Sequence, residues 1–250
     1  MPHDLVNSLI GKPFIILDTV DSSNNYAMEQ VHAGLASHGH AYFAKDQYAG
    51  KGQRGKTWIS EPGENIALSI VLNATYPGNQ NPFLLSAAIA LAGYDFLDDL
   101  LKTNVSIKWP NDLYWRDRKT GGILIENIYQ GKEWRYAIAG IGINVNQTEF
   151  PEGINAVSIR EITGEKFDAL ELASHLCGKI QTRYEQLTKN NKNLISEYNE
   201  HLFKKKEAVK LRKGNIVFET TVDHVTSSGE LITKDTIERV FEFGEIEWIL

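Results

Sequence analysis

Apolar and polar positions along the chain predict a mixture of strands and helices up to about residue 203. Short apolar runs rich in β-branched residues predict strands, whereas apolar positions repeated every three or four residues predict helices. The clearest helical repeat begins at Pro82, and it places Leu84, Ala88, Leu91 and Phe96 on one face. The expected strands cover residues 14–17, 41–47, 65–72, 105–110, 121–130 and 134–145. One helix is expected directly after residues 21–23, another over 82–102, and two successive helices over 167–187 and 193–203.

The pattern changes near residue 204, where the helical repeat gives way to short strands separated by polar turns. Closely spaced strands of this kind are typical of a small β barrel. The sequence therefore predicts an α/β (α+β) fold with two domains, a mixed-sheet core over residues 1–203 and a β domain over residues 204–250. The strands of the second domain are expected over residues 208–213, 216–225, 230–234, 237–243 and 245–250.

Composition and charge favour a soluble protein that does not bind nucleic acid. Of 250 residues, 42% are hydrophobic, and 32 acidic against 26 basic residues give a net charge of −6. Binding to nucleic acid depends on basic surface that displaces counterions, so this balance disfavours it. The longest apolar stretch, residues 83–101, is interrupted by a serine and three aspartates, which a membrane span would not tolerate.

The cysteine content and the N-terminal residues favour a reducing compartment. Cys177 is the sole cysteine and falls within an apolar helical pattern, so the chain can form no internal disulfide and the thiol is expected to be buried. Residues 1–14 lack the basic and apolar regions of a signal peptide. We therefore expect a cytoplasmic protein without a membrane segment.

The segment Gly50–Thr57 matches the GxxxxGK(S/T) pattern of P-loop nucleotide-binding proteins letter for letter. A P-loop requires a helix that begins at the second Gly-Lys pair and directs its free amides at the phosphates. Here Pro62 and a β-branched run follow, which disfavours a helix and with it a P-loop NTPase. Three glycines beside Lys51, Arg54 and Lys56 instead favour a loop that binds a small anion such as a nucleotide phosphate, with a solvated hairpin turn as the alternative.

A second group of polar residues precedes the strand expected at 121–130. Asn111 and Asp112 follow a Lys-Trp-Pro sequence and offer oxygen atoms to a hydrated Mg²⁺ ion. Lys119 stands just before two glycines, where its ammonium group can lean over a ligand as a point charge. A polar hairpin with a surface lysine is the alternative for this segment taken alone.

Taken together, these segments resemble the catalytic core of the biotin protein ligases. The resemblance extends over almost the whole chain, since the C-terminal GEIEWI segment is similar to part of the family's SH3-like domain. It implies a mixed-sheet core of the biotin and lipoate ligase type followed by an SH3-like barrel. The matching core segments are DSSNN at 21–25, AKDQYAGKGQRGKTW at 44–58, IKWPNDLYWRDRKTGGILIE at 107–126 and AIAGIGINVN at 137–146.

This resemblance implies a ligase that uses ATP, biotin and Mg²⁺. Members of the family convert biotin and ATP into biotinyl-5′-AMP, then transfer the biotinyl group to one lysine of the biotin carboxyl carrier protein of acetyl-CoA carboxylase or another biotin-dependent carboxylase. Bifunctional members carry an N-terminal DNA-binding domain, whereas here the core begins near residue 14. We therefore expect a monofunctional, cytoplasmic ligase without DNA binding, and homodimerisation through sheet edges stays open.

The resemblance also implies roles for individual residues of these segments. The residues expected to be catalytic are Lys119, Arg54 and Asp112, and Asp112 is also the candidate Mg²⁺ ligand. The residues expected to bind biotin are Ser22, Ser23, Asn24, Gln47, Gly50, Lys51, Gly52, Gln53, Lys119 and Gly122. The residues expected to bind ATP are Lys51, Gln53, Arg54, Trp58, Lys108, Asn111, Lys119 and Asn144.

The glycine-rich loop departs from the family pattern G-R-G-R-x-G at both arginine positions. Lys51 keeps the charge without the bidentate geometry of arginine, and Gln53 carries no charge. Arg54, one position later, can take over part of the missing role. Because fixing a glycine-rich backbone costs conformational entropy, we expect this loop to be mobile in the free protein and ordered when biotin or biotinyl-5′-AMP is bound.

Two further function classes stay as alternatives. Lipoate or octanoate protein ligases share the fold but carry an RRxSGGG-type motif, which this chain lacks. A catalytically silent biotin-binding module is disfavoured because Lys119 and Asp112 are both present.

Overall fold

The computed structural model describes residues 9–75, 81–189 and 193–249, and most of its core strands join one large mixed sheet. In the described part of the chain this sheet has seven strands in the order β1-β2-β3-β7-β6-β5-β4. β1 and β2 pair in parallel, and the other neighbours pair in antiparallel fashion. The strands are β1 (Phe14–Val20), β2 (Ala41–Gln47), β3 (Asn65–Asn73), β4 (Val105–Lys108), β5 (Asp112–Trp115), β6 (Arg118–Gln130) and β7 (Glu133–Asn144).

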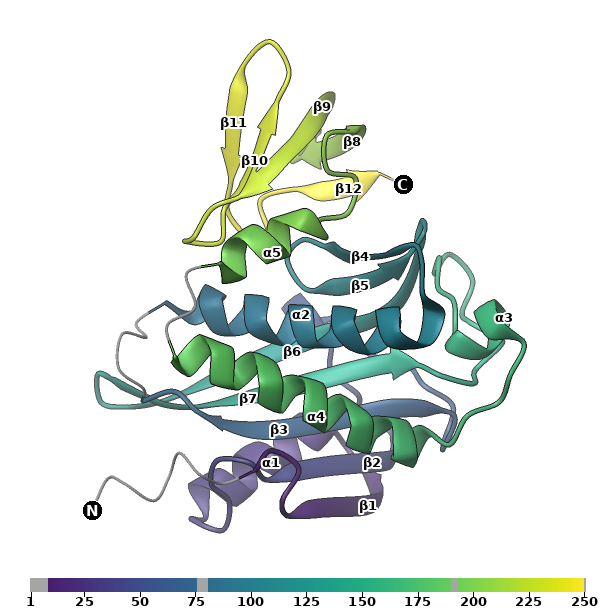
Figure 1. The fold of residues 1–250 in the computed structure, drawn as a ribbon, viewed down its shortest axis with the longest axis vertical. Coiled ribbons are helices and arrows are strands. Elements are labelled where there is room, and N and C mark those ends of the chain that lie inside the picture. The colour runs from purple at the N-terminus through teal and green to yellow at the C-terminus, as the bar shows by residue number, and fades with distance from the viewer. Residues whose placement is uncertain (1–8, 76–80, 190–192, 250) are drawn as a thin grey trace.

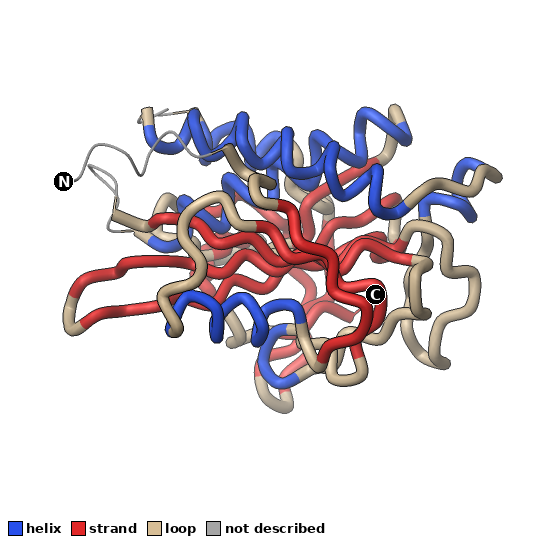
Figure 2. The backbone as a smooth tube through the Cα atoms, turned by 90° about the horizontal axis from the view of Figure 1, so that it is seen from below, coloured by secondary structure: helices blue, strands red, loops and turns tan. Residues whose placement is uncertain are grey.

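Helices cover both faces of the large sheet (Figure 1 and Figure 2). α2 and α4 pack side by side on one face, in the core that contains Phe43 and Ile70. α1 packs on the other face, where Ala27 contacts the core formed by Tyr42 and Val71. Successive strand residues point to opposite faces, so neighbouring sequence positions serve two separate cores. The helices are α1 (Ser23–His32), α2 (Pro82–Leu101), α3 (Ile159–Thr163), α4 (Ala169–Thr188) and α5 (Leu194–Glu200), with a short 3₁₀ turn η1 (Gln53–Gly55).

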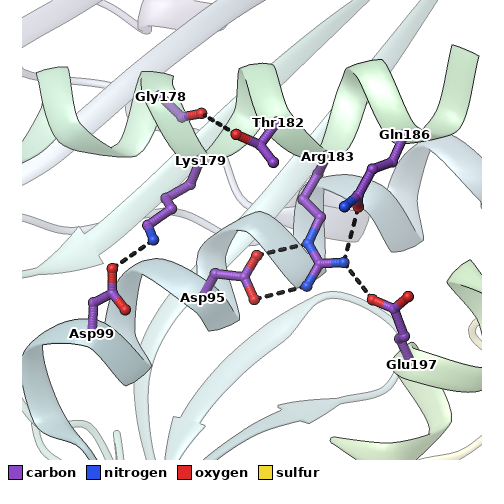
Figure 3. Close-up of polar contacts among 8 residues, drawn as sticks. All are labelled: Asp95, Asp99, Gly178, Lys179, Thr182, Arg183, Gln186 and Glu197. Atoms are coloured by element: carbon purple, nitrogen blue, oxygen red, sulfur yellow. Dashed lines mark hydrogen bonds and ion pairs between the residues drawn. The ribbon is translucent and has the colours of Figure 1, made fainter.

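A network of ion pairs joins α2, α4 and α5 (Figure 3). Arg183 of α4 donates from Nε and Nη2 to the two carboxylate oxygens of Asp95 in α2, at 2.6 and 2.8 Å. The same guanidinium group donates to Glu197 of α5, and Lys179 lies 2.5 Å from Asp99 of α2. The hydrogen bonds with Asp95 raise the pKa of Arg183 and keep it charged. This bidentate geometry fixes how the three helices lie against one another.

Most elements that the sequence predicts are confirmed, including the strands on either side of the glycine-rich loop and the long helix α2. The loop expected at 111–120 is wrong, because β5 forms within it and β6 already begins at Arg118. The polar composition of this segment favoured a loop, but it holds a tight hairpin in which Arg116 adopts a left-handed φ of 52°. Leu113 and Tyr114 of β5 are buried. The sequence did not predict α3, whereas the two helices expected within 167–203 are confirmed as α4 and α5.

The C-terminal residues form a second, antiparallel sheet, which confirms the expected β structure. Within the described residues its five strands follow the order β11-β10-β9-β8-β12, and no pairing between β11 and β12 closes it into a barrel. Asn199 of α5 holds this sheet to the core through two hydrogen bonds with the backbone of Val225, at 2.8 and 2.6 Å. The division into domains at residues 203 and 204 stays a prediction. The strands are β8 (Ala208–Lys213), β9 (Ile216–Val225), β10 (Leu231–Lys234), β11 (Glu238–Phe241) and β12 (Glu247–Ile249).

The single thiol of the chain lies inside the core. Cys177 of α4 is only 4% exposed, and burial raises its pKa to about 12. A Cβ atom added at Gly11 would lie 3.1 Å from the Cβ of Cys177, so the N-terminal turn covers it closely. The expectation of a buried thiol is therefore confirmed. Among the described helices, none combines the length and the apolar character that crossing a membrane requires.

Candidate active site

A cavity of about 770 Å³ lies between the large sheet and the C-terminal sheet. Residues of β6, β7, the segment 51–59 and the C-terminal segment 243–248 line it. All residues that the sequence assigned to biotin or ATP line this cavity except Gly50, and their individual roles stay predictions. The fold thus brings together residues that lie far apart in the chain: the Asn24 side chain contacts the backbone carbonyl of Leu124, 100 positions away.

Gly50 lies at the base of the glycine-rich loop rather than on the cavity wall. Its carbonyl accepts a hydrogen bond from the Trp58 N–H at 2.9 Å. A Cβ atom at this position would lie 2.5 Å from the carbonyl oxygen of Trp58, a distance that real Cβ atoms do not reach. The glycine therefore lets the two ends of the loop approach each other.

Two glycines of β7 leave the floor of the cavity free of side chains. Gly140 and Gly142 lie on the same face of the strand because they are two positions apart. Asn24 lies over Gly140, and a Cβ atom there would be only 2.8 Å from its Cγ atom. Trp58 lies over Gly142, where a Cβ atom would be 2.6 Å from the indole Cε2 atom. Trp58 Nε1 is buried and lacks a partner among the described residues, as a donor that awaits a ligand would be.

The beginning of α1 presents neutral polar groups to the cavity. Ser22, Ser23 and Asn24 are buried, with exposed fractions of 2%, 5% and 3%. The Ser23 N–H donates to Gln47 Oε1 at 2.7 Å, which fixes the amide of Gln47. These hydroxyl and amide groups include both donors and acceptors, so they suit a ligand with N–H and C=O groups in one ring.

Two residues that the sequence did not predict form hydrogen bonds with Ser23 and Asn24. The Ser69 hydroxyl of β3 lies 2.8 Å from Ser23 Oγ and 2.5 Å from Asn24 Oδ1. Glu126 of β6 accepts a hydrogen bond from Asn24 Nδ2 at 2.9 Å. The signal for Ser69 is a single hydroxyl in an otherwise apolar run, and the signal for Glu126 is a carboxylate in a strand with apolar neighbours.

Lys119 and Asp112, both expected to be catalytic, form an ion pair in the cavity. Lys119 Nζ lies 2.6 Å from Asp112 Oδ1, and the two side chains are 30% and 25% exposed. Asp112 pairs with Gly122 across β5 and β6, and a Cβ atom at Gly122 would lie 3.1 Å from Lys119 Nζ. The glycine therefore leaves the space that the ammonium group occupies.

Lys108 brings a second cation to the cavity among aromatic rings. Its Nζ donates to the Tyr114 hydroxyl at 3.1 Å, and it lies 4.9 Å from the centre of that ring and 5.6 Å from the centre of the Trp248 ring. Burial lowers the pKa of Lys108 to about 8, while Asp112 favours the charged form. Because Trp248 belongs to β12, the C-terminal sheet contributes to the surroundings of this lysine.

The amide groups of Asn111 and Asn144 bind the backbone around the cavity. Asn144 Nδ2 donates to the carbonyls of Lys119 and Val157, each at 3.3 Å. Asn111 Nδ2 donates to the carbonyl of Ile123. Both amino groups are thus engaged with protein, so contacts to a nucleotide would fall mainly on the amide oxygens.

The candidate Mg²⁺ ligand can be tested against its neighbours. No group of three or more His, Cys, Asp or Glu residues that could hold a metal occurs in the described ranges. Asp112 supplies one carboxylate, and the adjacent Asn111 supplies an amide oxygen. Mg²⁺ in nucleotide sites is commonly held by one or two carboxylates together with phosphates and water. These residues therefore fit a Mg²⁺ ion that arrives with ATP rather than one enclosed by protein.

The glycine-rich loop lines the cavity and contacts both β6 and the turn at Gly244. Gln53 Nε2 donates to the Ile123 carbonyl of β6 at 3.2 Å. Arg54 adopts a left-handed φ of 55°, and its guanidinium group lies against the turn at Gly244, where a Cβ atom would be 3.0 Å from Cζ. The described residues 56–64 contain no helix, so the interpretation as a P-loop is excluded. The expected mobility of the free loop stays a prediction.

Comparison with known sequences points to one family. Residues 16–144 match the profile of the biotin/lipoate A/B protein ligase family. The chain is 32% identical over 185 residues to the bifunctional ligase/repressor BirA of Bacillus subtilis, which covers 72% of this chain and 56% of that protein. It is 27% identical over 180 residues to the biotin–acetyl-CoA-carboxylase ligase of Mycobacterium tuberculosis, which covers 71% of this chain and 66% of that protein. The chain spans little more than half the length of the bifunctional relatives that it matches.

Solved structures show the same architecture. The biotin protein ligase from Aquifex aeolicus in complex with biotin and ATP is similar with a TM-score of 0.79 and 28% identity, covering 94% of this chain and 97% of that one. The biotin protein ligase from Leishmania major in complex with biotinyl-5-AMP is similar with a TM-score of 0.64 and 22% identity, covering 91% of this chain and 98% of that one. The similarity to the second structure shows only that the fold is shared.

Proposed function

Because this chain belongs to the biotin/lipoate A/B protein ligase family, we propose that it is an ATP-dependent biotin protein ligase. The observation that carries the proposal is the distribution of groups along β6 in the cavity. Asn24 lies beside Leu124 and Glu126, whereas Lys119 and Asp112 lie beside Gly122. The neutral donors and acceptors around Asn24 suit the ureido ring of biotin. The cation at Lys119 suits the carboxylate of the same ligand.

The first proposed step joins biotin to AMP. A carboxylate oxygen of biotin attacks the α-phosphorus of ATP, the bond to the β-phosphate oxygen breaks, and pyrophosphate leaves. Negative charge gathers between the two reactants, so positive side chains must stabilise it. Lys119 is our choice for this role, with Asp112 orienting its ammonium group at 2.6 Å. Arg54 and Lys108 also line the cavity and add positive charge near the phosphates.

The second proposed step transfers the biotinyl group. The ε-amine of a carrier lysine attacks the acyl carbon of biotinyl-5′-AMP, an amide forms, AMP leaves, and the nitrogen releases a proton. Water would hydrolyse this mixed anhydride, so the intermediate must be covered. The glycine-rich loop and Trp58 lie along the cavity and are suited to cover it.

Mg²⁺ belongs to the proposal as a companion of ATP. Asp112 and Asn111 would hold it, and the ion would neutralise phosphate charge during adenylation. Lys119 shares the Asp112 carboxylate, so the same side chain would orient one cation and bind the other.

The proposed partner is the biotin carboxyl carrier protein of acetyl-CoA carboxylase or of another biotin-dependent carboxylase. A relative from Paracoccus denitrificans, 35% identical over 133 residues, carries the name biotin–acetyl-CoA-carboxylase ligase. We further propose that the protein acts in the cytoplasm without sequence-specific DNA binding, in keeping with its net charge of −6. Homodimerisation through sheet edges stays an open part of the proposal.

A direct experiment tests the substrate. The protein is incubated with ATP, Mg²⁺ and either biotin or octanoate, and the acyl-adenylates are measured by mass spectrometry. We expect biotinyl-5′-AMP, followed by biotinylation of an added apo carrier domain. Preferential adenylation of octanoate would instead favour a lipoate or octanoate ligase, and sequence-specific DNA binding at physiological salt would contradict the monofunctional assignment.

A further inference from the structure

Glu126 joins two parts of the candidate site that lie far apart in the chain. Its Oε2 atom accepts a hydrogen bond from Asn24 Nδ2 at 2.9 Å, and its Oε1 atom lies 3.3 Å from Lys51 Nζ. The carboxylate is 26% exposed and lies on β6, on the same face as Gly122 and Leu124. One side chain therefore connects the beginning of α1 with the glycine-rich loop.

The contact with Asn24 fixes the orientation of its amide. An ionised carboxylate only accepts hydrogen bonds, so the amino group of Asn24 must face Glu126. Its carbonyl oxygen then faces Ser69, whose hydroxyl lies 2.5 Å away, and retains a second lone pair. A carbonyl oxygen in the cavity is an acceptor for the N–H group of a ureido ring. The Leu124 carbonyl accepts a longer hydrogen bond from the same amino group, at 3.4 Å, so Glu126 supplies the shorter of the two contacts that fix the amide.

The contact with Lys51 holds the glycine-rich loop to β6. The two side chains are 41% and 26% exposed, and ion pairs in contact with water contribute little to stability. Such a weak pair can hold a loop closed and still let it open for ligand entry. Gln53, which donates to the Ile123 carbonyl at 3.2 Å, adds a second contact between loop and strand.

We propose that Glu126 is a positioning residue that orients Asn24 toward the biotin ring and holds the glycine-rich loop closed through Lys51. The part that concerns biotin rests on the proposed function, whereas the part that concerns the loop does not. Because one carboxylate serves both contacts, closure of the loop and recognition of the ring are coupled.

Three variants separate the two contacts, and a fourth is the control. Glu126→Gln keeps an oxygen that accepts from Asn24 but removes the charge that attracts Lys51. Glu126→Leu removes both contacts, and Lys51→Met removes the cation alone. Glu133→Gln removes an exposed carboxylate of β7 that lies 3.5 Å from Arg135, outside the cavity. Thermal unfolding of each variant shows that it is folded before the other measurements.

Hydrogen exchange of the loop amides in the ligand-free, full-length protein tests the loop contact. We expect exchange at residues 51–56 to rise about two- to fivefold in Glu126→Gln and in Lys51→Met, and not in Glu133→Gln. The double variant Glu126→Gln with Lys51→Met should exchange no faster than either single variant. Wild-type exchange in the single variants, or additive effects in the double variant, would overturn the loop contact.

Biotin binding measured by calorimetry tests the contact with Asn24. We expect Glu126→Leu to raise the Kd for biotin about tenfold or more, and Glu126→Gln to raise it less than about threefold. A loss that both variants share equally, or neither shows, would overturn the orienting role. If the wild-type protein does not bind biotin at all, the proposed function fails, while the exchange experiment still decides the loop contact.

Discussion

At the scale of single residues, Lys119 should matter more for the chemical step than for holding biotin. Its ammonium group, held 2.6 Å from Asp112, would stabilise charge that grows between the carboxylate oxygen and phosphorus. Removing one preorganised charge of this kind costs about 100- to 1000-fold in rate, so Lys119→Ala should lower kcat by that factor. Single-turnover formation of biotinyl-5′-AMP, with biotin affinity measured in parallel, checks this. If the variant forms the adenylate at the normal rate but binds ATP poorly, Lys119 contributes to substrate binding and not to the chemical step.

Gly140 should be intolerant of even one methyl group. Since Asn24 lies directly over this glycine, Gly140→Ala must displace the amide that faces the proposed biotin site. We expect the Kd for biotin to rise about tenfold or more while the protein stays folded. Gly178→Ala in α4 is the matched control, because a Cβ atom there meets nothing within 4 Å. Equal biotin affinity in both variants would contradict the placement of Asn24 directly over Gly140 in the biotin site.

Gln53 offers a test of what retains the intermediate. An arginine at this position would add a charge near the acyl phosphate, so Gln53→Arg should slow the release of biotinyl-5′-AMP about tenfold. Arg54→Ala should speed release, because it removes a charge that lines the cavity. Release is measured by diluting the protein–adenylate complex into excess unlabelled biotin and ATP. Unchanged rates in both variants would assign retention to the backbone amides of the loop.

At the scale of elements, the ion pairs among α2, α4 and α5 should contribute strongly to stability. Arg183 is 11% exposed, and its removal would leave the carboxylates of Asp95 and Glu197 close together without a cation. We expect Arg183→Met to lower the free energy of unfolding by about 2 kcal/mol or more. Lys189→Met, which removes an exposed pair with Glu185, should cost less than about 0.5 kcal/mol. Urea denaturation compares the two, and similar midpoints would contradict the role of the network.

The elements that could be predicted from the sequence are those with a local cause. Short apolar runs rich in β-branched residues predicted most of the strands, and three glycines beside basic residues predicted the position of the ligand loop. β5 could not be found in this way, because its four residues begin with Asp112 and lie in a polar segment, so they are recognisable as a strand only through pairing with β4 and β6.

The candidate site could be predicted where a motif carried it, and not where distant residues meet. Ser69 contacts Ser23 from 46 positions away, and Glu126 contacts Asn24 from 102 positions away. Trp248 reaches the cavity from the C-terminal sheet. No periodicity or spacing in one segment reports such contacts, since they follow from how the two sheets pack.

At the scale of the whole molecule, His38 should make stability depend on pH. It is 2% exposed, stacks on Tyr184 at 4.7 Å, and accepts a hydrogen bond from the Asn73 N–H on Nδ1. Burial lowers its pKa from 6.5 to about 4. Below pH 6.5 His38 is therefore protonated in the unfolded chain but stays neutral in the folded protein. The free energy of unfolding thus decreases as the pH falls toward 4.

The size of this effect can be measured with one variant. Integrated down to pH 4, the shift corresponds to a loss of about 3 kcal/mol, and none of it is expected above pH 7. His38→Phe keeps an aromatic ring beside Tyr184 but cannot take up a proton, so its stability should fall less steeply between pH 6.5 and 4. Urea denaturation at several pH values checks this, and parallel curves for the two proteins would show that His38 is not the responsible group.

The burial of Cys177 has a practical consequence for observing the protein at work. Its raised pKa and its place beneath Gly11 keep the native thiol away from alkylating reagents. Tyr48, by contrast, is 75% exposed and precedes the glycine-rich loop by two positions. A Tyr48→Cys variant would carry one accessible thiol, and a fluorophore or spin label attached there would report opening and closing of the loop without any other cysteine having to be removed.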